Sequence, residues 1–227
     1  MLALVGSGEY LPPIAPLDRA LIARLAAAVR VVCLPTAAGT EGRERIDYWS
    51  RLGVEHFTGL GVEVEALPVI DRASANDPGL AAVVAEANFV YLSGGKPHYL
   101  HRTLDGSLVW QAILAVLARG GLLAGCSAGA MILGEKFFGF PGSKRGFAFL
   151  PGATVVPHFE ELPQHMLGVM RRIAGKDLTI LGIEGNTALV QTGDGYEVLG
   201  SGGVTVWNQA GQTRFTAGPL PFWANNQ

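Results

Sequence analysis

The sequence predicts an α/β fold: a doubly wound, mainly parallel sheet flanked by helices, with antiparallel strands added in the C-terminal third. Over the first 150 residues or so, short apolar runs alternate with stretches of helical periodicity. The runs are apolar nearly throughout, which is typical of strands buried on both faces of a parallel sheet. Beyond that point, short segments separated by hairpin-type turns follow one another, which favours antiparallel pairing.

The order of the expected elements is strand, helix, strand, helix, and it favours helices on both sides of one sheet. The expected strands are 2–6, 31–35, 62–67, 89–92 and 122–126, and the expected helices are 17–29, 43–60, 80–87 and 108–118. In the C-terminal third we expect a strand at 153–156, a helix at 164–173 and strands at 178–182, 187–191, 196–200 and 204–207, with turns at 192–195 and 201–203. No linker or repeat divides the chain, so a single domain over 1–227 is expected.

Composition narrows the function classes. Hydrophobic residues make up 49% and charged residues 16%, with a formal net charge of −2, so the chain can bury a large core. Without a long basic run, no nucleic-acid or membrane-surface partner is expected. No apolar run approaches the ~20 residues that span a bilayer, and the start lacks the basic region of a secretion signal, so a cytoplasmic protein is expected. Cys33 and Cys126 lie in apolar runs and are expected to be buried thiols.

The sharpest motif is Gly125-Cys126-Ser127-Ala128-Gly129, which follows an apolar strand and precedes a helix-like stretch. This is the G-x-S-x-G pattern in the strand–turn–helix context of a nucleophile elbow. The two glycines give the strained turn room, and the start of the following helix aims N–H groups at a developing oxyanion. The pattern therefore predicts Ser127 as a nucleophile of a serine hydrolase.

A serine nucleophile needs a base, and the chain has five histidines. His158 ends an apolar strand, a usual position for functional groups in an open parallel sheet, and is the preferred candidate. The other four are His56, expected on the surface of a polar helix, His98 and His101 in a helix-like stretch, and His165 in a further helix.

The base needs an orienting carboxylate, and an oxyanion needs donors. Glu184 follows an apolar strand and is the preferred acid over surface acids such as Glu160 and Glu161, with Glu135 as the rival. The turn Ser93-Gly94-Gly95-Lys96 could supply one backbone N–H, to act with that of Ala128. The turn at 6–9 lacks the last glycine of a dinucleotide fingerprint, so no nucleotide cofactor is expected.

Taken in order, these motifs resemble those of the peptidase E and cyanophycinase family of serine peptidases. The matching segments are 6–9, 34–38, the Gly-Gly turn at 94–95, 125–130, Pro157-His158-Phe159 and 182–188. The resemblance implies a fold related to class I glutamine amidotransferases and a metal-free Ser-His-acid mechanism. It implies that Ser127 is the nucleophile, His158 the base, and Gly95 and Ala128 the oxyanion donors.

Two departures from the family pattern concern the acid and the specificity. Cyanophycinase-type sequences tend to have Asp-Glu where this chain has Glu184-Gly185, which makes the acid the least secure member of a Ser127–His158–Glu184 triad. Relatives carry arginines soon after the His-Phe pair that help to recognise acidic substrates, whereas this chain has no arginine there until Arg171. We therefore expect an exopeptidase that acts on short peptides without strict preference for N-terminal aspartate. A homodimer is a possible assembly. If an acidic pocket exists, Lys96, Arg145 or Arg171 is expected to form it.

Two other functions fit parts of the sequence. An esterase of the α/β-hydrolase type shares the elbow, but such enzymes place the acid before the histidine, and here His158 precedes Glu184. A catalytically inactive, amidotransferase-like binding protein would share the fold. The intact serine and histidine disfavour it.

Overall fold

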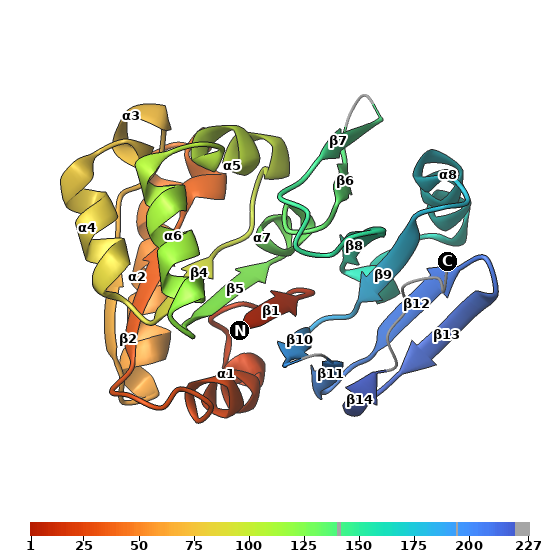
Figure 1. The fold of residues 1–227 in the computed structure, drawn as a ribbon, viewed down its shortest axis with the longest axis horizontal. Helices are drawn as coiled ribbons and strands as arrows, with labels where there is room; N and C mark the ends of the chain where they lie inside the picture. The colour runs from red at the N-terminus through yellow and green to blue at the C-terminus, as the bar shows by residue number, and fades with distance from the viewer. Residues whose placement is uncertain (140–141, 194, 221–227) are drawn as a thin grey trace.

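A mixed sheet forms the centre of the molecule in the computed structural model, which describes residues 1–139, 142–193 and 195–220 (Figure 1). Its strands are β1 (Leu2–Val5), β2 (Arg30–Leu34), β3 (Glu63–Ala66), β4 (Phe89–Leu92), β5 (Leu122–Cys126), β10 (Thr187–Thr192), β11 (Gly195–Gly200) and β14 (Gly218–Leu220). Across the sheet their order is β14-β11-β10-β1-β5-β4-β2-β3. The run from β1 to β3 is parallel, and β10, β11 and β14 add antiparallel strands at one side.

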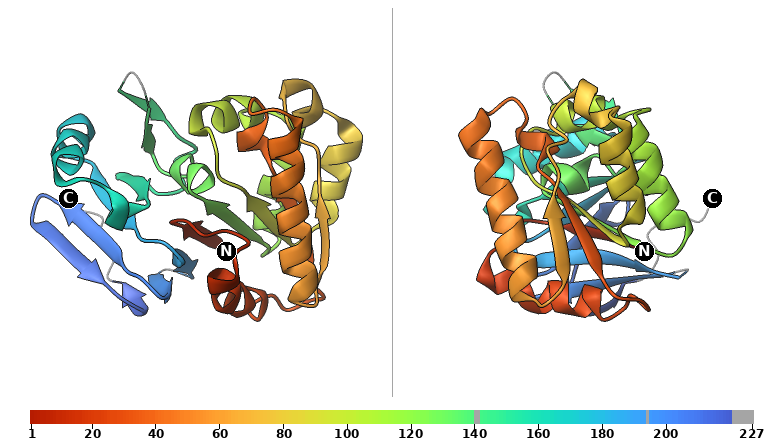
Figure 2. Two further views of the ribbon diagram at one scale, coloured as in Figure 1. Left: turned by 180° about the vertical axis from the view of Figure 1, so that it is seen from behind. Right: turned by 90° about the vertical axis from the view of Figure 1, so that its left-hand side faces the viewer.

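Helices cover both faces of the parallel part, because its strands are apolar on both sides. Around one face lie α1 (Ala15–Ile22) and α2 (Arg43–Gly59), and around the other α4 (Pro78–Glu86) and α6 (Leu108–Ala118). The right-hand view of Figure 2 shows the strands between these two layers. The shorter helices α3 (Arg72–Ala75), α5 (Pro97–Leu104) and α7 (Ala128–Met131) pack over the carboxyl ends of the strands, where α5 follows β4 and α7 follows β5. The predicted fold class is confirmed.

A second, four-stranded sheet lies beside the first one in the described residues. It contains β8 (Ala153–Pro157), β9 (Thr179–Ile183), β12 (Val204–Asn208) and β13 (Gly211–Phe215) in the order β13-β12-β9-β8, with α8 (Gln164–Ala174) between β8 and β9. The expectation that the C-terminal strands join the main sheet holds for β10 and β11 and is wrong for β8, β9 and β12, which belong to the second sheet. Both edges of β11 are occupied, by β10 and β14, so β12 pairs with β9 instead.

Other local differences from the sequence prediction are small. The first helix ends at Ile22 rather than at residue 29, because the N–H groups of Arg24 and Leu25 bond to carbonyls only three residues back and so close the helix. A hairpin of β6 (Lys136–Phe138) and β7 (Ser143–Arg145) was not expected. Within the turn expected at 192–195, Asp194 lies outside the described residues, as does the 221–227 end of the predicted single domain.

Buried polar groups sit within the layer between α1, α2 and the sheet. Both cysteines are buried as expected, and burial raises the pKa of Cys33 to about 12. His56, expected at the surface, has a side chain only 5% exposed, because its Nε2 lies 2.8 Å from Oδ2 of the fully buried Asp18. Burial raises the pKa of Asp18, while the hydrogen bond to His56 opposes that change.

None of the helices in the described ranges is both long and apolar enough to cross a membrane.

Candidate active site

Ser127 stands on a sharp turn between β5 and α7. Its backbone has φ 50° and ψ −109°, a strained conformation for a residue with a side chain. The Ser127 N–H donates to the carbonyl of Val5 in the neighbouring strand β1 at 3.0 Å, and the Ser127 carbonyl accepts from the N–H of Met131 at 3.0 Å. The turn is thus held on both sides, and the serine is fixed where β5 meets the helix.

The two glycines of the elbow are required by close backbone contacts. A Cβ at Gly125 would lie 2.5 Å from the backbone carbonyl group of Gly129, and a Cβ at Gly129 would lie 2.5 Å from the carbonyl oxygen of Leu92 in β4. Neither contact could relax by side-chain motion, since backbone atoms are involved. The helix α7 therefore rests directly on the ends of β4 and β5.

His158 reaches the serine from the second sheet. It follows β8, and its Nε2 lies 3.3 Å from Oγ of Ser127, within hydrogen-bond reach. Its backbone is left-handed, with φ 52° and ψ 36°, which turns the chain into the short 3₁₀ helix η3 (Phe159–Glu161). The ring of Phe159 packs where a Cβ of Gly182 would be, 2.3 Å away, so the glycine in β9 makes room for the anchor of this turn.

The nearest carboxylate to the other nitrogen of His158 belongs to Glu161. Its Oε2 lies 3.5 Å from Nδ1 of His158, and the side chains are 63% and 41% exposed respectively. Sequence reasoning had placed Glu161 among the surface acids. The spacing of three residues across a tight turn was the signal that could have paired it with His158.

Glu184, the acid preferred from sequence, is engaged elsewhere. Its Oε1 accepts from Nε of Arg214 at 2.5 Å, and its Oε2 accepts from Nη2 of Arg214 at 2.7 Å and from the N–H of Gly203 at 2.9 Å. The hydrogen bond from Arg214 is the main reason that the pKa of Glu184 is lowered. The rival acid Glu135 accepts from the N–H of Gly152 at 2.8 Å. The structure brings neither carboxylate to His158.

Gly95 and Ala128, the two expected oxyanion donors, have different surroundings, but their backbone N–H groups have one property in common. Within the described part of the chain, neither the N–H of Gly95 nor that of Ala128 has a hydrogen-bond acceptor. Gly95 has φ +136°, and a Cβ there would lie 2.8 Å from the backbone carbonyl of Ala37, so only glycine fits.

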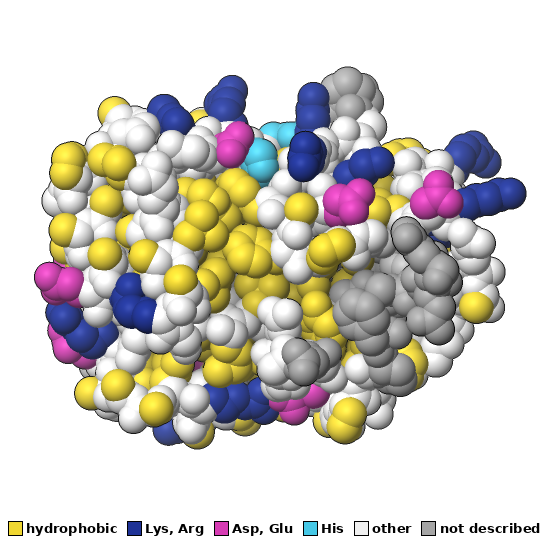
Figure 3. Space-filling model, viewed as in Figure 1, with side chains coloured by type: hydrophobic (Ala, Val, Ile, Leu, Met, Phe, Trp, Pro, Cys, Tyr) yellow, Lys and Arg dark blue, Asp and Glu magenta, His cyan; other side chains and the backbone are white. Residues whose placement is uncertain are grey.

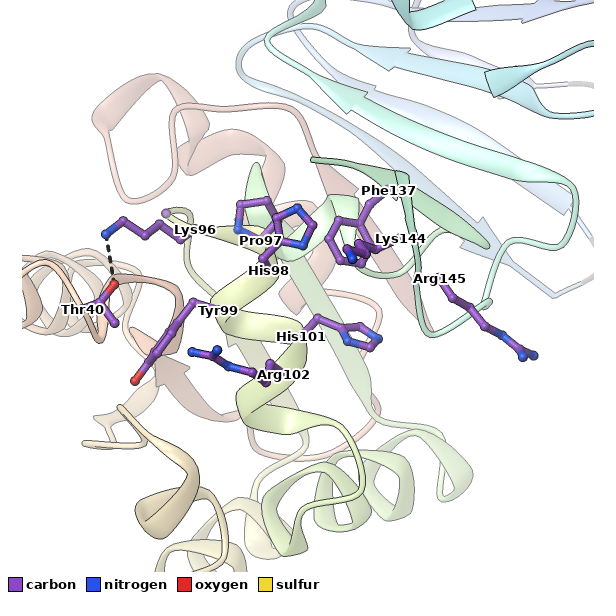
Figure 4. A pocket seen from close by; sticks show the side chains of 11 residues that line it. Thr40, Lys96, Pro97, His98, Tyr99, His101, Arg102, Phe137, Lys144 and Arg145 are labelled. Carbon is purple, nitrogen blue, oxygen red and sulfur yellow. Dashed lines mark hydrogen bonds between the residues drawn. The ribbon is translucent and has the colours of Figure 1, made fainter. Parts of the chain in front are cut away.

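The other histidines lie away from this pair. His98 and His101 point from α5 towards Phe137, at ring-centroid distances of 5.1 and 5.5 Å, and His101 also stacks on Phe147 (Figure 4). Burial lowers the pKa of His101, which favours the neutral ring. His165 is exposed on α8.

A pocket of about 830 Å³ opens beside Gly95, between α5 and the β6–β7 hairpin. Its lining includes four basic side chains, Lys96, Arg102, Lys144 and Arg145, and no acidic one. Figure 4 shows Lys96 extending towards Thr40, to which its Nζ donates at 3.0 Å. Figure 3 shows Lys, Arg and His side chains gathered at this edge of the molecule.

Arg171 lies in a different place from Lys96 and Arg145. Its guanidinium donates to the carbonyls of Trp207 and Leu178 and stands 5.7 Å from the centroid of the Trp207 ring, so it ties α8 to the second sheet. Among the described residues, no three His, Cys, Asp or Glu side chains group as metal ligands would.

A serine on a strand–helix elbow, with a histidine at its oxygen, is the arrangement of a serine hydrolase. The chain belongs to peptidase family S51, whose family model matches residues 2–199. It is 31% identical over 174 residues to the cyanophycinases of Synechococcus elongatus and Thermosynechococcus vestitus, a match that covers 70% of this chain. The match covers 54% of those proteins, so this chain spans about half the length of these curated relatives.

Two solved structures are similar along most of the chain. A peptidase from an acI-B1 Actinobacterium superposes with a TM-score of 0.87 at 36% identity and covers 97% of this chain and 96% of its own. A putative peptidase E from Listeria monocytogenes EGD-e has a TM-score of 0.64 at 18% identity, covers 88% and 98% respectively, and shows the shared fold. The family resemblance expected from the sequence is confirmed.

The Glu184–Arg214 pair predicts how stability depends on pH. Because the pKa of Glu184 is lower in the folded state, the pair stabilises the protein above the ordinary glutamate pKa, and this contribution is lost as the pH falls through the lowered value. Glu184→Gln should therefore reduce the melting temperature at pH 7 and flatten its fall below about pH 5. Thermal unfolding of both proteins from pH 7 to pH 3 measures this. Glu63→Gln, at an exposed ion pair with Arg30, is the control, and an equal flattening there would contradict the prediction.

Proposed function

We propose that this chain is a serine exopeptidase that hydrolyses short peptides through an acyl-enzyme on Ser127. The observation that carries the proposal is the 3.3 Å approach of His158 Nε2 to the oxygen of an elbow serine. Membership of peptidase family S51 supports it, and the solved relative at 36% identity is described as a peptidase. The short distance between His158 Nε2 and Ser127 Oγ also disfavours a catalytically inactive binding protein.

The proposed mechanism assigns one proton path. His158 Nε2 takes the proton of Ser127 as Oγ attacks the scissile carbonyl carbon. The oxyanion of the tetrahedral intermediate accepts from the free N–H groups of Gly95 and Ala128. His158 then gives the proton to the leaving amine, and the acyl-enzyme forms. Water, deprotonated by the same histidine, hydrolyses the ester in the second half.

Two carboxylates are candidates for the acid that orients His158. Glu184 stays a prediction from sequence order, and to serve His158 it would have to leave Arg214 and Gly203. The contact at 3.5 Å favours Glu161. Since Glu161 is largely exposed, water screens its charge, and its contribution should be modest.

Substrate size and charge follow from the surroundings of the elbow. The pocket beside Gly95 can hold a side chain or two, which suits short, unfolded peptides. Two acids, Glu160 and Glu161, follow the His158-Phe159 pair, and they would repel an acidic substrate group. The basic side chains of the pocket oppose that effect, but Lys96 is turned to Thr40. We therefore keep the expectation of no strict preference for N-terminal aspartate.

Replacement of the nucleophile tests the mechanism. Ser127→Ala should lower kcat/KM by roughly a thousandfold or more, because only the oxyanion donors and substrate binding would remain. His158→Ala should have a loss of similar size. The measurement is dipeptide hydrolysis followed by mass spectrometry, with His165→Ala as the matched histidine control. Near-normal turnover by Ser127→Ala would show that the mechanism is wrong.

The two acid candidates make opposite predictions. Glu161→Gln should lower kcat about tenfold, the effect of a weakened, solvent-screened orienting charge, whereas Glu184→Gln should change kcat by less than about threefold in protein that stays folded. Steady-state kinetics at a temperature well below both melting points separates them. A hundredfold loss in Glu184→Gln, with Glu161→Gln unaffected, would reinstate the acid assigned from sequence.

Specificity is tested with Asp-Leu, Ala-Leu, Leu-Leu and an N-blocked tripeptide. We expect the kcat/KM for Asp-Leu to exceed that for Ala-Leu by less than about a hundredfold, or ~2.7 kcal/mol in the transition state. A larger advantage would mean that the pocket beside Gly95 reads an acidic group. Lys96→Met and Arg145→Met should then remove the advantage, whereas Arg171→Met, outside that pocket, should leave it in place.

A further inference from the structure

The turn after β1 buries a carboxylate that the proposed mechanism does not use. Glu9 is only 6% exposed, although glutamate is one of the residue types least often buried without a partner. None of the ion pairs found in the described ranges includes Glu9. A buried carboxylate without a cation needs hydrogen-bond donors, and their identity shows what it holds.

Both donors to Glu9 come from segments that carry the proposed oxyanion donors. Oε1 accepts from the N–H of Gly94 at 2.9 Å, and Oε2 accepts from the thiol of Cys126 at 2.9 Å. Gly94 directly precedes Gly95, and Cys126 directly precedes Ser127. Burial first, and then the charge of Glu9, raise the pKa of Cys126 far above its usual value, so the sulfur keeps the proton that it donates.

Hydrogen bonds hold the Gly-Gly turn on both sides of the Gly95 N–H. The hydroxyl of Ser93 lies 2.9 Å from that of Tyr10, the N–H of Gly94 donates to Glu9, and the N–H of Lys96 donates to Ala37 at 3.0 Å. The peptide between Gly94 and Gly95 is thus flanked by two anchored peptides, and it carries the N–H that has no acceptor among the described residues. This arrangement fixes the direction of the Gly95 N–H before any substrate binds.

The space around Gly94 is filled by the Glu9 carboxylate and leaves no room for a side chain. A Cβ at Gly94 would lie 2.6 Å from Oε1 of Glu9 and 3.3 Å from Cβ of Ser127. The Gly94 backbone therefore lies against both the Glu9 carboxylate and Ser127, and a side chain at position 94 would collide with that carboxylate. Glu9 itself lies between two residues with positive φ, Gly8 at 89° and Tyr10 at 64°, in the sharp turn that follows β1.

We propose that Glu9 is a positioning residue, whose buried carboxylate accepts from Gly94 and so aims the Gly95 N–H at the oxyanion of the reaction. The inference rests on the proposed function, because it assumes that an oxyanion forms at Ser127. Glu9 touches no substrate, and its effect should appear in kcat rather than in KM.

Three substitutions test the acceptor. Glu9→Met keeps the length of the side chain and removes both acceptor oxygens, Glu9→Asp keeps the charge but is one methylene too short to reach both donors, and Glu9→Gln keeps one carbonyl oxygen for Gly94. We expect Met and Asp to lower kcat about 10- to 100-fold with KM changed less than about threefold, and Gln to stay within about threefold of the wild type. Asp18→Asn is the matched control, because it alters another buried carboxylate, and it should lower the melting temperature while kcat is unchanged.

The rate at which a fluorophosphonate labels Ser127 gives a readout without peptide substrate, because the phosphoryl oxygen needs the same donors. It should fall with kcat in the Met and Asp variants. Folded Met or Asp protein with kcat and labelling within about twofold of the wild type would overturn the proposal, as would a Gln variant that loses as much as Met.

Amide hydrogen exchange of the wild type keeps the test valid if these variants do not fold. The Gly94 N–H should be protected and the Gly95 N–H should exchange quickly, and fast exchange at Gly94 would overturn the proposal. If wild-type Ser127 neither turns over peptides nor reacts with the probe, the proposed function fails, and the exchange pattern then reports on the turn alone.

Discussion

The contact of the α7 backbone with the ends of β4 and β5 is the constraint on which the whole site depends. Because positions 125 and 129 carry no side chain, the helix rests on the strands at 2.5 Å from where each Cβ would be. That closeness accompanies the strained turn at Ser127, with φ 50° and ψ −109°. Strain of this kind costs on the order of 1–3 kcal/mol and persists only where its surroundings over-determine it. Here a buried strand on either side of β5 does so.

Charge is distributed unevenly around that elbow. Acids lie on the side of the second sheet, where Glu160, Glu161 and Glu184 gather near the end of β8 and β9, and bases lie on the side of α5 and the β6–β7 hairpin. One acid, Glu184, is neutralised by Arg214, and another, Glu160, accepts from the N–H of Gly185 at 2.7 Å. A peptide lying across the elbow would cross from one potential to the other, which orients its dipole and its charged termini.

The sequence was sufficient for the fold class and the elbow, because each depends on local chemistry, and the position of His158 after an apolar strand made it the preferred candidate for the base. Apolar runs ending in glycine define the strands, and a serine between two glycines defines the turn. It did not reveal that Glu184 is bound by Arg214, because that arginine lies in β13, 30 residues further along the chain, and only the folded sheet brings the two together. It also missed the second sheet, because edge occupancy is a property of the assembled strands and not of any one segment. Glu9 belongs to the motif at residues 6–9, whose glycines indicate a turn but do not show that the Glu9 carboxylate is buried.

The nucleophile and its base belong to different sheets. Ser127 follows β5 in the main sheet, whereas His158 follows β8 in the second one, and the chain crosses between these sheets before β8, between β9 and β10, between β11 and β12, and between β13 and β14. The Oγ–Nε2 distance therefore depends on how the two sheets pack against each other, and not on the ladder hydrogen bonds within either sheet. A probe of secondary structure reports on those ladders, so it would not register a change in that distance.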